Sequence, residues 1–431
     1  MSTDRFRNLE PALPGLFHEL AQMRTPDYLE AAIERASERS QRPRWTFPER
    51  WLPVELVTSR VPVARMPWRQ IGVLALLAIV LIASLALYAG SRQRPLPAPF
   101  GPAANGSILF AMDGDIYAAD PRTGASKAIV TGPERDSEPV YSLDGTRVLF
   151  GRPSDSEPGR LLFVSRDDGS ALVQVTPEPL PGVSSWSFSP DGRSIVAFAA
   201  GDQGLAIVVI PSDGKGPAKA YPVFATTDDG PPQYRPDGSE IMFIGKEPGQ
   251  ANRGVYALDP ATGTVRAIAA PEATRDMHGA SWSPDGKHVA LGVVDPTAAV
   301  TTGRTHVVGV DGTGDITVDT NPRSVADYGF AWSNDGTRLI ITRWYTEGGS
   351  KAGSAIVPID RSSPGIEIEC PPGVLTDDCT ADWSWSPDDS LLLGTLDGGG
   401  TSQFLADPTT GTVREAPWTA SGHPAWQRLA R

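Results

Sequence analysis

The sequence predicts an all-β propeller of seven blades, with a six-bladed ring as the alternative, preceded by one transmembrane helix and a short α-helical tail. Three observations support this prediction. A phrase of an aromatic residue, two further residues, Asp, and then Gly or Asp occurs six times between residues 138 and 390. Residues 71–90 form an apolar run without a charge. The two ends of the repeat region carry complementary half-units. Together these features predict a tail at 1–70, a span at 71–90, a stalk at 91–103 and a propeller at 104–431.

The tail at 1–70 has two candidate helices, at about 12–23 and 26–41. Thr25, Pro26 and Asp27 are typical of a helix start. Several large aromatic residues follow, and a tail of this length cannot fully bury them. Docking at the membrane interface, contact with a protein partner, and local packing within the tail are the alternatives for them. The candidate partner or membrane-interface residues are Trp45, Phe47, Trp51 and Trp68.

The apolar run at 71–90 is twenty residues long. At about 1.5 Å per helical residue it reaches roughly 30 Å, the thickness of a bilayer core. A signal peptide is the competing interpretation, but seventy residues precede the run. Three arginines flank its N-terminal side and two flank the other, which favours an inside N-terminus. These arginines are Arg60, Arg65 and Arg69 before the span, and Arg92 and Arg94 after it.

The repeated phrase has a nearly constant spacing. Its Asp residues lie 47, 46, 48, 50 and 53 positions apart, a period typical of stacked supersecondary units. Asp and Gly favour a tight turn, and an apolar strand begins four residues after each Asp. Three or four short strands per unit are typical of a propeller blade. The aromatic residues are Tyr141, Phe188, Tyr234, Trp282, Trp332 and Trp385, and the Asp residues are Asp144, Asp191, Asp237, Asp285, Asp335 and Asp388.

Six acids at matching positions resemble a catalytic or metal-binding ring, but each also has its own turn to stabilise. We therefore assign all six a structural role. In the last repeat Asp389 replaces the turn glycine, and it tolerates a left-handed backbone at some cost.

The half-units at the two ends predict a composite blade. Residues 424–426 match the start of the phrase, yet only five residues follow them. Residues 106–110 and 115–120 resemble the strands that follow the phrase elsewhere, but no phrase precedes them. One blade built from both ends raises the count from six to seven and leaves no open sheet edge.

The chain has two cysteines, Cys370 and Cys379, in a loop that contains Pro and Gly. We predict a disulfide between them, with two unpaired thiols as the alternative. A disulfide requires an oxidising compartment, which agrees with a propeller outside the cytoplasm.

The turns WSPDG at 282–286, FSPDG at 188–192 and WSNDG at 332–336, each followed by a strand, resemble TolB-type propeller repeats related to the WD class. A later turn with the pattern D-x-x-x-G strengthens the likeness, which covers about three quarters of the chain. Such propellers serve as periplasmic scaffolds, as substrate-filtering domains of prolyl-oligopeptidase-like peptidases and as the outer part of membrane sensors. The resemblance therefore implies a fold and several functions.

The overall layout is similar to that of membrane-bound anti-sigma factors of bacteria. It implies a single-pass protein of the bacterial cytoplasmic membrane, with the N-terminus inside and the propeller outside. The zinc-binding version of that family is excluded, because the tail has one histidine, His18, and no cysteine.

Enzyme signatures are missing from the sequence. It has no G-x-S-x-G elbow, no H-E-x-x-H and no P-loop, and its five histidines show no metal-ligand spacing. We expect no catalytic residue, metal or cofactor. A net charge of −13 without a basic stripe argues against nucleic-acid binding.

The function predicted from the sequence is that of a membrane-anchored extracytoplasmic binding or sensory module that signals through its cytoplasmic tail. Its expected partners are the membrane and a protein bound to the propeller or the tail. A structural scaffold of an envelope complex is the alternative, followed by an extracytoplasmic hydrolase or lyase.

Overall fold

The computed structural model describes residues 76–78, 100–155, 157–183, 185–201, 204–226, 230–297, 303–345, 351–370, 381–396, 402–418 and 420–430. The chain divides into two compact units, Met1–Gln93 and Arg94–Arg431. In the first unit only 76–78 are described, and they are helical. Among the described residues, no helix has the length and apolar character needed to cross a membrane. The predicted tail at 1–70 and the rest of the predicted span lie outside the described residues, so both stay predictions.

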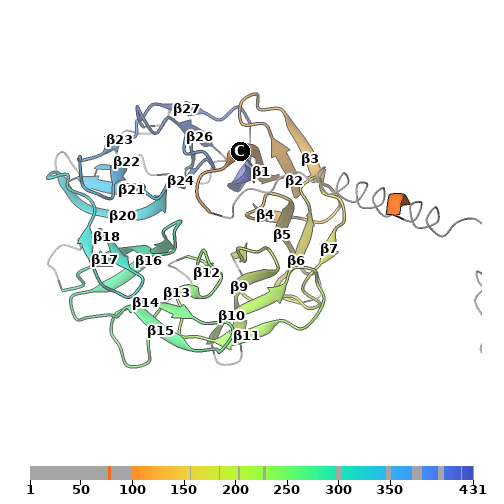
Figure 1. The fold of residues 1–431 in the computed structure, drawn as a ribbon, viewed down its shortest axis with the longest axis horizontal. Helices are drawn as coiled ribbons and strands as arrows, with labels where there is room; N and C mark the ends of the chain where they lie inside the picture. The colour runs from red at the N-terminus through yellow and green to blue at the C-terminus, as the bar shows by residue number, and fades with distance from the viewer. Residues whose placement is uncertain are drawn as a thin grey trace, which may run out of the picture. The chain divides into compact units, whose positions relative to one another are not determined.

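The second unit is a ring of seven four-stranded antiparallel sheets (Figure 1). The seven-bladed propeller is confirmed, and the six-bladed alternative is wrong. We number the blades along the chain, and the composite blade is blade 7. Blade 1 contains β4 (Ser137–Tyr141), β5 (Arg147–Pro153), β6 (Arg160–Arg166) and β7 (Val173–Gln174). Blade 2 contains β8 (Trp186–Phe188), β9 (Ser194–Gly201), β10 (Gly204–Pro211) and β11 (Lys219–Pro222). Blade 3 contains β12 (Gln233–Tyr234), β13 (Ile241–Gly245), β14 (Gly254–Leu258) and β15 (Val265–Ala269).

The remaining blades repeat this pattern. Blade 4 contains β16 (Asp276–Trp282), β17 (His288–Val294), β18 (Gly303–Gly309) and β19 (Ile316–Thr317). Blade 5 contains β20 (Ser324–Trp332), β21 (Arg338–Tyr345), β22 (Lys351–Pro358) and β23 (Ile366–Glu367). Blade 6 contains β24 (Asp382–Trp385), β25 (Leu392–Thr395), β26 (Gln403–Ala406) and β27 (Val413–Glu415). Blade 7 contains β28 (Ser421–Leu429), β1 (Ala104–Met112), β2 (Asp115–Ala119) and β3 (Ser126–Val130).

Blade 7 joins the two ends of the ring. β28 pairs with β1 in antiparallel register, with Ile108 opposite Trp426 and Leu109 opposite Ala425. The composite blade expected from the two half-units is therefore present. Residues just before β1 also contact the ring: the amide of Ala103 donates to the carbonyl of Pro387 at 2.7 Å.

The sheet order gives the ring two distinct faces. The first strand of each blade borders the centre and the fourth lies at the rim (Figure 1). Because neighbouring strands are antiparallel, the turns after the first and third strands lie on one face, which we call the turn face. The loops after the second and fourth strands lie on the other, which we call the loop face.

The hydrophobic core lies between neighbouring blades. One cluster joins Leu149 and Leu162 of blade 1 to Phe188 and Ile195 of blade 2. Tryptophans of the phrase add hydrogen bonds across this boundary, because each indole N–H donates to the carbonyl that precedes the equivalent aromatic residue of the preceding blade. These bonds are Trp282 to Gln233 at 3.2 Å, Trp332 to Ser281 at 3.2 Å and Trp385 to Ala331 at 3.1 Å.

Candidate functional site

The repeated Asp residues bind the backbone and side chains of their own turns. Asp144 Oδ1 accepts hydrogen bonds from the Ser142 hydroxyl at 2.5 Å and from the Thr146 amide at 3.0 Å. Burial alone would raise the pKa of Asp144, but these hydrogen bonds outweigh it and lower the pKa. A serine two residues earlier makes the same contact at 2.7, 2.6, 2.6 and 2.9 Å with Asp191, Asp285, Asp335 and Asp388. Asp237, which lacks this serine, accepts from the Ser239 amide at 2.9 Å.

The other residues singled out in the sequence lie partly outside the described part of the chain. Trp45, Phe47, Trp51 and Trp68 are not among the described residues. Cys370 is disulfide-bonded. Its predicted partner Cys379 lies outside the described residues, so the pairing stays a prediction.

Ionisable side chains lie near the loop-face ends of three neighbouring innermost strands. Asp382 of β24, His423 of β28 and Glu138 of β4 each stand three residues before the aromatic position of their blade. His423 Nδ1 lies 3.9 Å from Asp382 Oδ2, and their side chains are 66% and 63% exposed. In the other four blades the corresponding residues are small or uncharged: Ser185, Pro231, Gly279 and Gly329. At this position, ionisable side chains therefore lie on three adjacent blades, and we call Glu138, His423 and Asp382 the loop-face triad. The innermost strand of blade 4 also has ionisable side chains, Asp276 and His278, and Asp276 pairs with Arg253 at 2.8 Å.

Glu138 has a strained backbone. Its φ is 51°, whereas glycine supplies the positive φ at the matching positions, with 61° at Gly279 and 72° at Gly329. A side chain in this region costs free energy, and such strain is found preferentially at functional sites. The register of β4 shifts between Ser137 and Val140, as expected for a β-bulge, which redirects side chains.

The surroundings of Glu138 contain both signs of charge. Its Oε1 lies 3.5 Å from Nη1 of Arg160. Burial raises the pKa of the Glu138 carboxyl, and the charges of Arg160 and His423 oppose that rise. The triad thus presents two carboxyl groups and an imidazole to solvent on adjacent blades, a set suited to hydrogen-bonding a polar ligand. The triad was not predicted from the sequence, although its signal is present there as an ionisable residue three positions before the aromatic residue of each of these blades.

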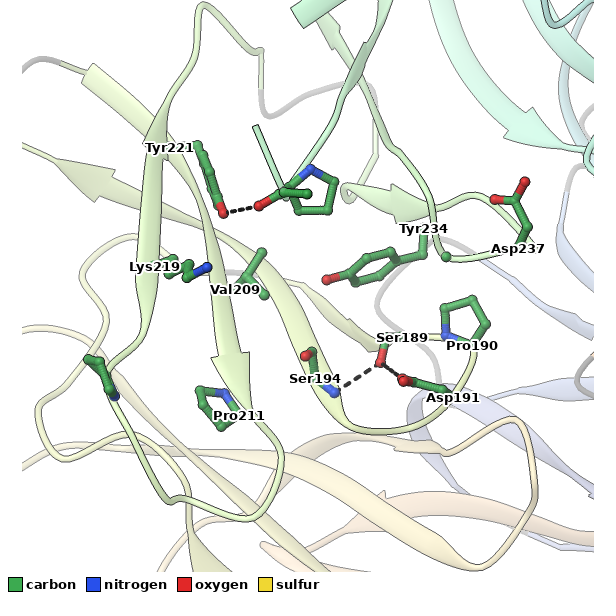
Figure 2. A pocket seen from close by; sticks show the side chains of 14 residues that line it. Ser189, Pro190, Asp191, Ser194, Val209, Pro211, Lys219, Tyr221, Tyr234 and Asp237 are labelled. Atoms are coloured by element: carbon green, nitrogen blue, oxygen red, sulfur yellow. Dashed lines mark hydrogen bonds between the residues drawn. The ribbon is translucent and has the colours of Figure 1, made fainter. Parts of the chain in front are cut away.

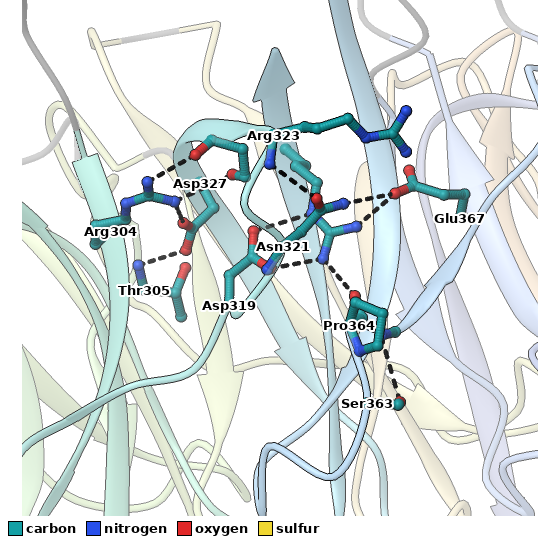
Figure 3. A network of polar contacts seen from close by, with 12 residues as sticks. Arg304, Thr305, Asp319, Asn321, Arg323, Asp327, Ser363, Pro364 and Glu367 are labelled. Atoms are coloured by element: carbon teal, nitrogen blue, oxygen red, sulfur yellow. Dashed lines mark hydrogen bonds and ion pairs between the residues drawn. The ribbon is translucent and has the colours of Figure 1, made fainter.

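A second polar cluster, between blades 4 and 5, is largely buried, and its charged groups are paired with one another (Figure 3). Arg343 Nη2 lies 2.7 Å from Asp319 Oδ1, and both side chains are 0% exposed. Asp327 accepts hydrogen bonds from Arg304 at 3.0 Å and from the Thr305 amide at 2.6 Å. Burial raises the pKa of Asp327, with the hydrogen bonds acting against it. Because its charged groups are satisfied by one another, this cluster serves to hold strands together.

Among the described residues, no group of three or more His, Cys, Asp or Glu side chains is arranged to hold a metal ion. The expectation of no metal, no cofactor and no catalytic residue is not tested by this observation and stays a prediction.

Comparison with known proteins identifies the fold. No family model matches the chain, and no curated protein sequence matches it. Oligogalacturonate lyase from Vibrio parahaemolyticus is similar, with a TM-score of 0.51 and 14% identity over 72% of this chain and 86% of that one. The β-propeller domain of the trilobed protease from Pyrococcus furiosus has a TM-score of 0.50 and 12% identity, covering 74% and 96%. TolB from Acinetobacter baumannii has a TM-score of 0.46 and 16% identity, covering 76% and 81%. At these identities the likeness extends to the fold alone, and the chain is a seven-bladed β-propeller.

Proposed function

We propose that this protein is a membrane-anchored binding or sensory module. Its propeller binds a polar ligand outside the cytoplasmic membrane through the loop-face triad, and its tail contacts a partner inside, in the manner of an anti-sigma factor. One observation supports the binding role above the others: ionisable side chains, two of them exposed and one partly exposed, occupy the same position on three adjacent blades, while the matching residues elsewhere are small or uncharged.

The rest of the ring strengthens this choice by elimination. The repeated turn carboxylates bind their own turns, and the charged groups between blades 4 and 5 neutralise one another. The triad also has ion-pair contacts, from Glu138 to Arg160 and from His423 to Asp382, but the side chains of His423 and Asp382 stay 66% and 63% exposed, and the strained Glu138 lies on the adjacent blade. Function is commonly carried by loops and strand ends on a rigid scaffold.

The site can be tested by photo-cross-linking in cells that express the full chain. A photoreactive residue at Glu157, in the exposed loop of blade 1 near Arg160, is expected to capture a ligand or partner. Ser170, exposed on the turn face of the same blade, is the matched control. Adducts at Glu157 that persist in the combined variant Glu138→Gln, His423→Asn and Asp382→Asn would contradict a role of the triad.

The membrane anchor rests on the apolar run at 71–90. A membrane-impermeant protease added to intact spheroplasts is expected to degrade the propeller and to spare the tail. Protection of the propeller would reverse the topology, while leaving a role of the triad in binding open to the cross-linking test.

The anti-sigma part rests on the layout of tail, span and outer domain. Purification of the full chain from its native membrane, after cross-linking, is expected to recover a sigma factor joined to residues 1–70. Adducts of the tail with lipid alone would contradict this part of the proposal.

A further inference from the structure

One position of the repeat controls how neighbouring blades meet on the turn face. It lies three residues after each turn Asp, at or just before the start of the second strand. The residues at this position, in chain order, are Arg147, Ser194, Glu240, His288, Arg338 and Leu391.

Where an arginine stands here, its guanidinium covers the aromatic residue of the next blade. Arg147 lies 5.2 Å from the ring centroid of Phe188, and Arg338 lies 4.8 Å from that of Trp385. Arg147 also donates hydrogen bonds to the Ser212 hydroxyl at 2.9 Å and to the carbonyl of Gly192, the turn glycine of the next blade.

Blade 3 reaches the same arrangement with an arginine from its turn. Arg235 lies 5.7 Å from the ring centroid of Trp282, and its Nε donates to the carbonyl of Gly286 at 3.1 Å. A guanidinium group therefore recurs at three blade boundaries, stacked on an aromatic ring. At two of them it also binds the turn-glycine carbonyl.

Where the arginine is missing, the structure has a cavity. Ser194 takes its place between blades 2 and 3, and a pocket of about 440 Å³ opens there (Figure 2). The pockets beside His288 and Leu391 measure about 400 and 870 Å³. Phe100 also lines the pocket beside His288. The pocket beside His288 is also lined by the aromatic residue and the turn glycine of its next blade, Trp332 and Gly336, but there an imidazole stands in place of the arginine. In the pocket beside Ser194, which Tyr234 and Gly238 of the next blade line, only a short serine side chain stands in that place.

The groups that would receive a guanidinium are present in this pocket. Gly238 corresponds to Gly192 and Gly286, and among the described residues no side chain donates to its carbonyl. Tyr234 projects into the pocket with its hydroxyl toward the far side (Figure 2). Burial, followed by the charge of Asp191, raises the pKa of Tyr234 to about 12, so the phenol stays neutral.

The charge of the lining favours a cation. Asp191 and Asp237 lie at the same side of the pocket as Tyr234, and Lys219, the one cationic residue of the lining, lies at the opposite side (Figure 2). Lys219 is exposed, so its ammonium group can turn to solvent. The lining thus has two carboxylates and one ammonium, although Arg193, 3.9 Å from Asp191, and Arg235, 3.4 Å from Asp237, offset part of the negative charge.

We propose that the pocket between blades 2 and 3 binds a small ligand that carries a guanidinium group, in the place that Arg147 and Arg338 fill at other boundaries. The guanidinium stacks on Tyr234 and donates to the carbonyl of Gly238. The volume lies within the range of small-molecule sites. The pocket is on the turn face, so this proposal goes beyond the function proposed for the loop-face triad and stands or falls separately.

The test is calorimetric titration of the full chain in detergent micelles with agmatine and with N-carbamoylputrescine, in which a neutral urea replaces the guanidinium and the terminal ammonium is kept. The Kd of agmatine is expected to be at least about tenfold lower than that of N-carbamoylputrescine, because the guanidinium is positively charged and the urea is not. Equal affinities, or no binding of agmatine, would overturn the proposal.

Variants place the binding in this pocket. Ser194→Arg supplies the missing side chain and is expected to raise the Kd for agmatine about tenfold or more, while Ser194→Ala changes it less than about threefold. Tyr234→Leu removes the ring without adding a side chain to the pocket and is expected to raise the Kd about fivefold, which keeps the test decisive if Ser194→Arg folds poorly. Lys219→Ala removes the opposing charge and is expected to tighten binding; weaker binding of agmatine to this variant would contradict a cation site.

Discussion

The carboxylate of Asp389 in blade 6 accepts a hydrogen bond from the backbone amide of Asn334 in blade 5 at 2.7 Å. It also accepts the amide of Asp335 at 2.9 Å and the side-chain amide of Asn334 at 2.9 Å. Asp389 stands where the other turns have glycine, and its φ is 60°. Asp389, which replaces the glycine of the repeat, therefore has a strained backbone but makes hydrogen bonds between two blades.

Replacing Asp389 by glycine separates these two effects. Glycine relieves the strain of the positive φ, by about 1 kcal/mol, but removes all three hydrogen bonds, each worth about 1 kcal/mol or more. We expect Asp389→Gly to lower the free energy of unfolding by about 2 kcal/mol in chemical denaturation. Asp389→Asn, which retains an acceptor, should lie between wild type and Asp389→Gly. A glycine variant more stable than wild type would show that the contacts do not compensate the strain.

Trp426 of the C-terminal half-unit differs from the tryptophans of the phrase in its hydrogen bonding. The indole N–H of Trp332 donates to the carbonyl of Ser281 at 3.2 Å, whereas the buried Nε1 of Trp426 has no partner among the described residues. Trp332→Phe loses this hydrogen bond, while Trp426→Phe removes an unsatisfied donor. We expect Trp332→Phe to be the more destabilising by about 1 kcal/mol in urea unfolding. If the two variants lose the same unfolding free energy, the loss comes from the smaller side-chain volume and not from the hydrogen bond.

The ion pair of Arg343 and Asp319 is sensitive to the loss of one partner. Both side chains are 0% exposed, so removing the cation leaves a buried carboxylate without its counter-charge. Arg343→Met is expected to cost about 3–5 kcal/mol of unfolding free energy. Arg193→Met is the control, since Arg193 is 88% exposed, and should change stability by less than about 0.5 kcal/mol. A small effect at Arg343 would indicate that water reaches the site.

The turn carboxylates make the unfolding stability of the propeller depend on pH. Burial alone would raise the pKa of Asp144, Asp285, Asp335 and Asp388, but hydrogen bonds outweigh it and each pKa is lowered. A carboxyl group whose pKa is lower in the folded protein than in the unfolded protein stabilises the fold at any pH above the unfolded-state value. That stabilisation is lost as the pH falls through the pKa of the folded state. We expect the urea midpoint to be level above about pH 5 and to fall below about pH 4.

Two carboxyls oppose that trend, because burial raises the pKa of Glu138 and Asp327. A variant isolates the contribution of one turn: Ser333→Ala removes the hydroxyl that donates to Asp335 at 2.6 Å and should flatten the acid decline. A midpoint that rises on acidification would mean that the raised groups dominate.

Glu138→Gly tests whether the strained backbone of Glu138 lowers stability while its side chain serves ligand binding. Glycine adopts the φ of 51° freely, so we expect this variant to gain up to about 1 kcal/mol of stability. The same variant should lose cross-linking at the loop face, because it removes a member of the triad. A variant that is less stable than wild type would show that the contact of Glu138 with Arg160 outweighs the strain.

The aromatic-x-x-Asp phrase by itself determined the blade and the ring. Turns such as Ser283 to Gly286 are local, since Ser283 and Asp285 bond each other across two positions, so their residues predict the structure without knowledge of the rest of the chain. The half-unit around Trp426 likewise predicted the composite blade, because its partner strand had to come from the other end of the sequence.

Only the tertiary structure decided what happens between blades. Asn334 and Asp389 are 55 positions apart, and the gap opposite Tyr234 exists because Ser194, from the preceding blade, is shorter than the arginine at matching boundaries. Similarly, Glu138, His423 and Asp382 form one group because blades 1, 7 and 6 are neighbours in the ring. Local turn chemistry is readable from the sequence, whereas contacts between blades depend on which side chains meet across a boundary, on their sizes and on their charges.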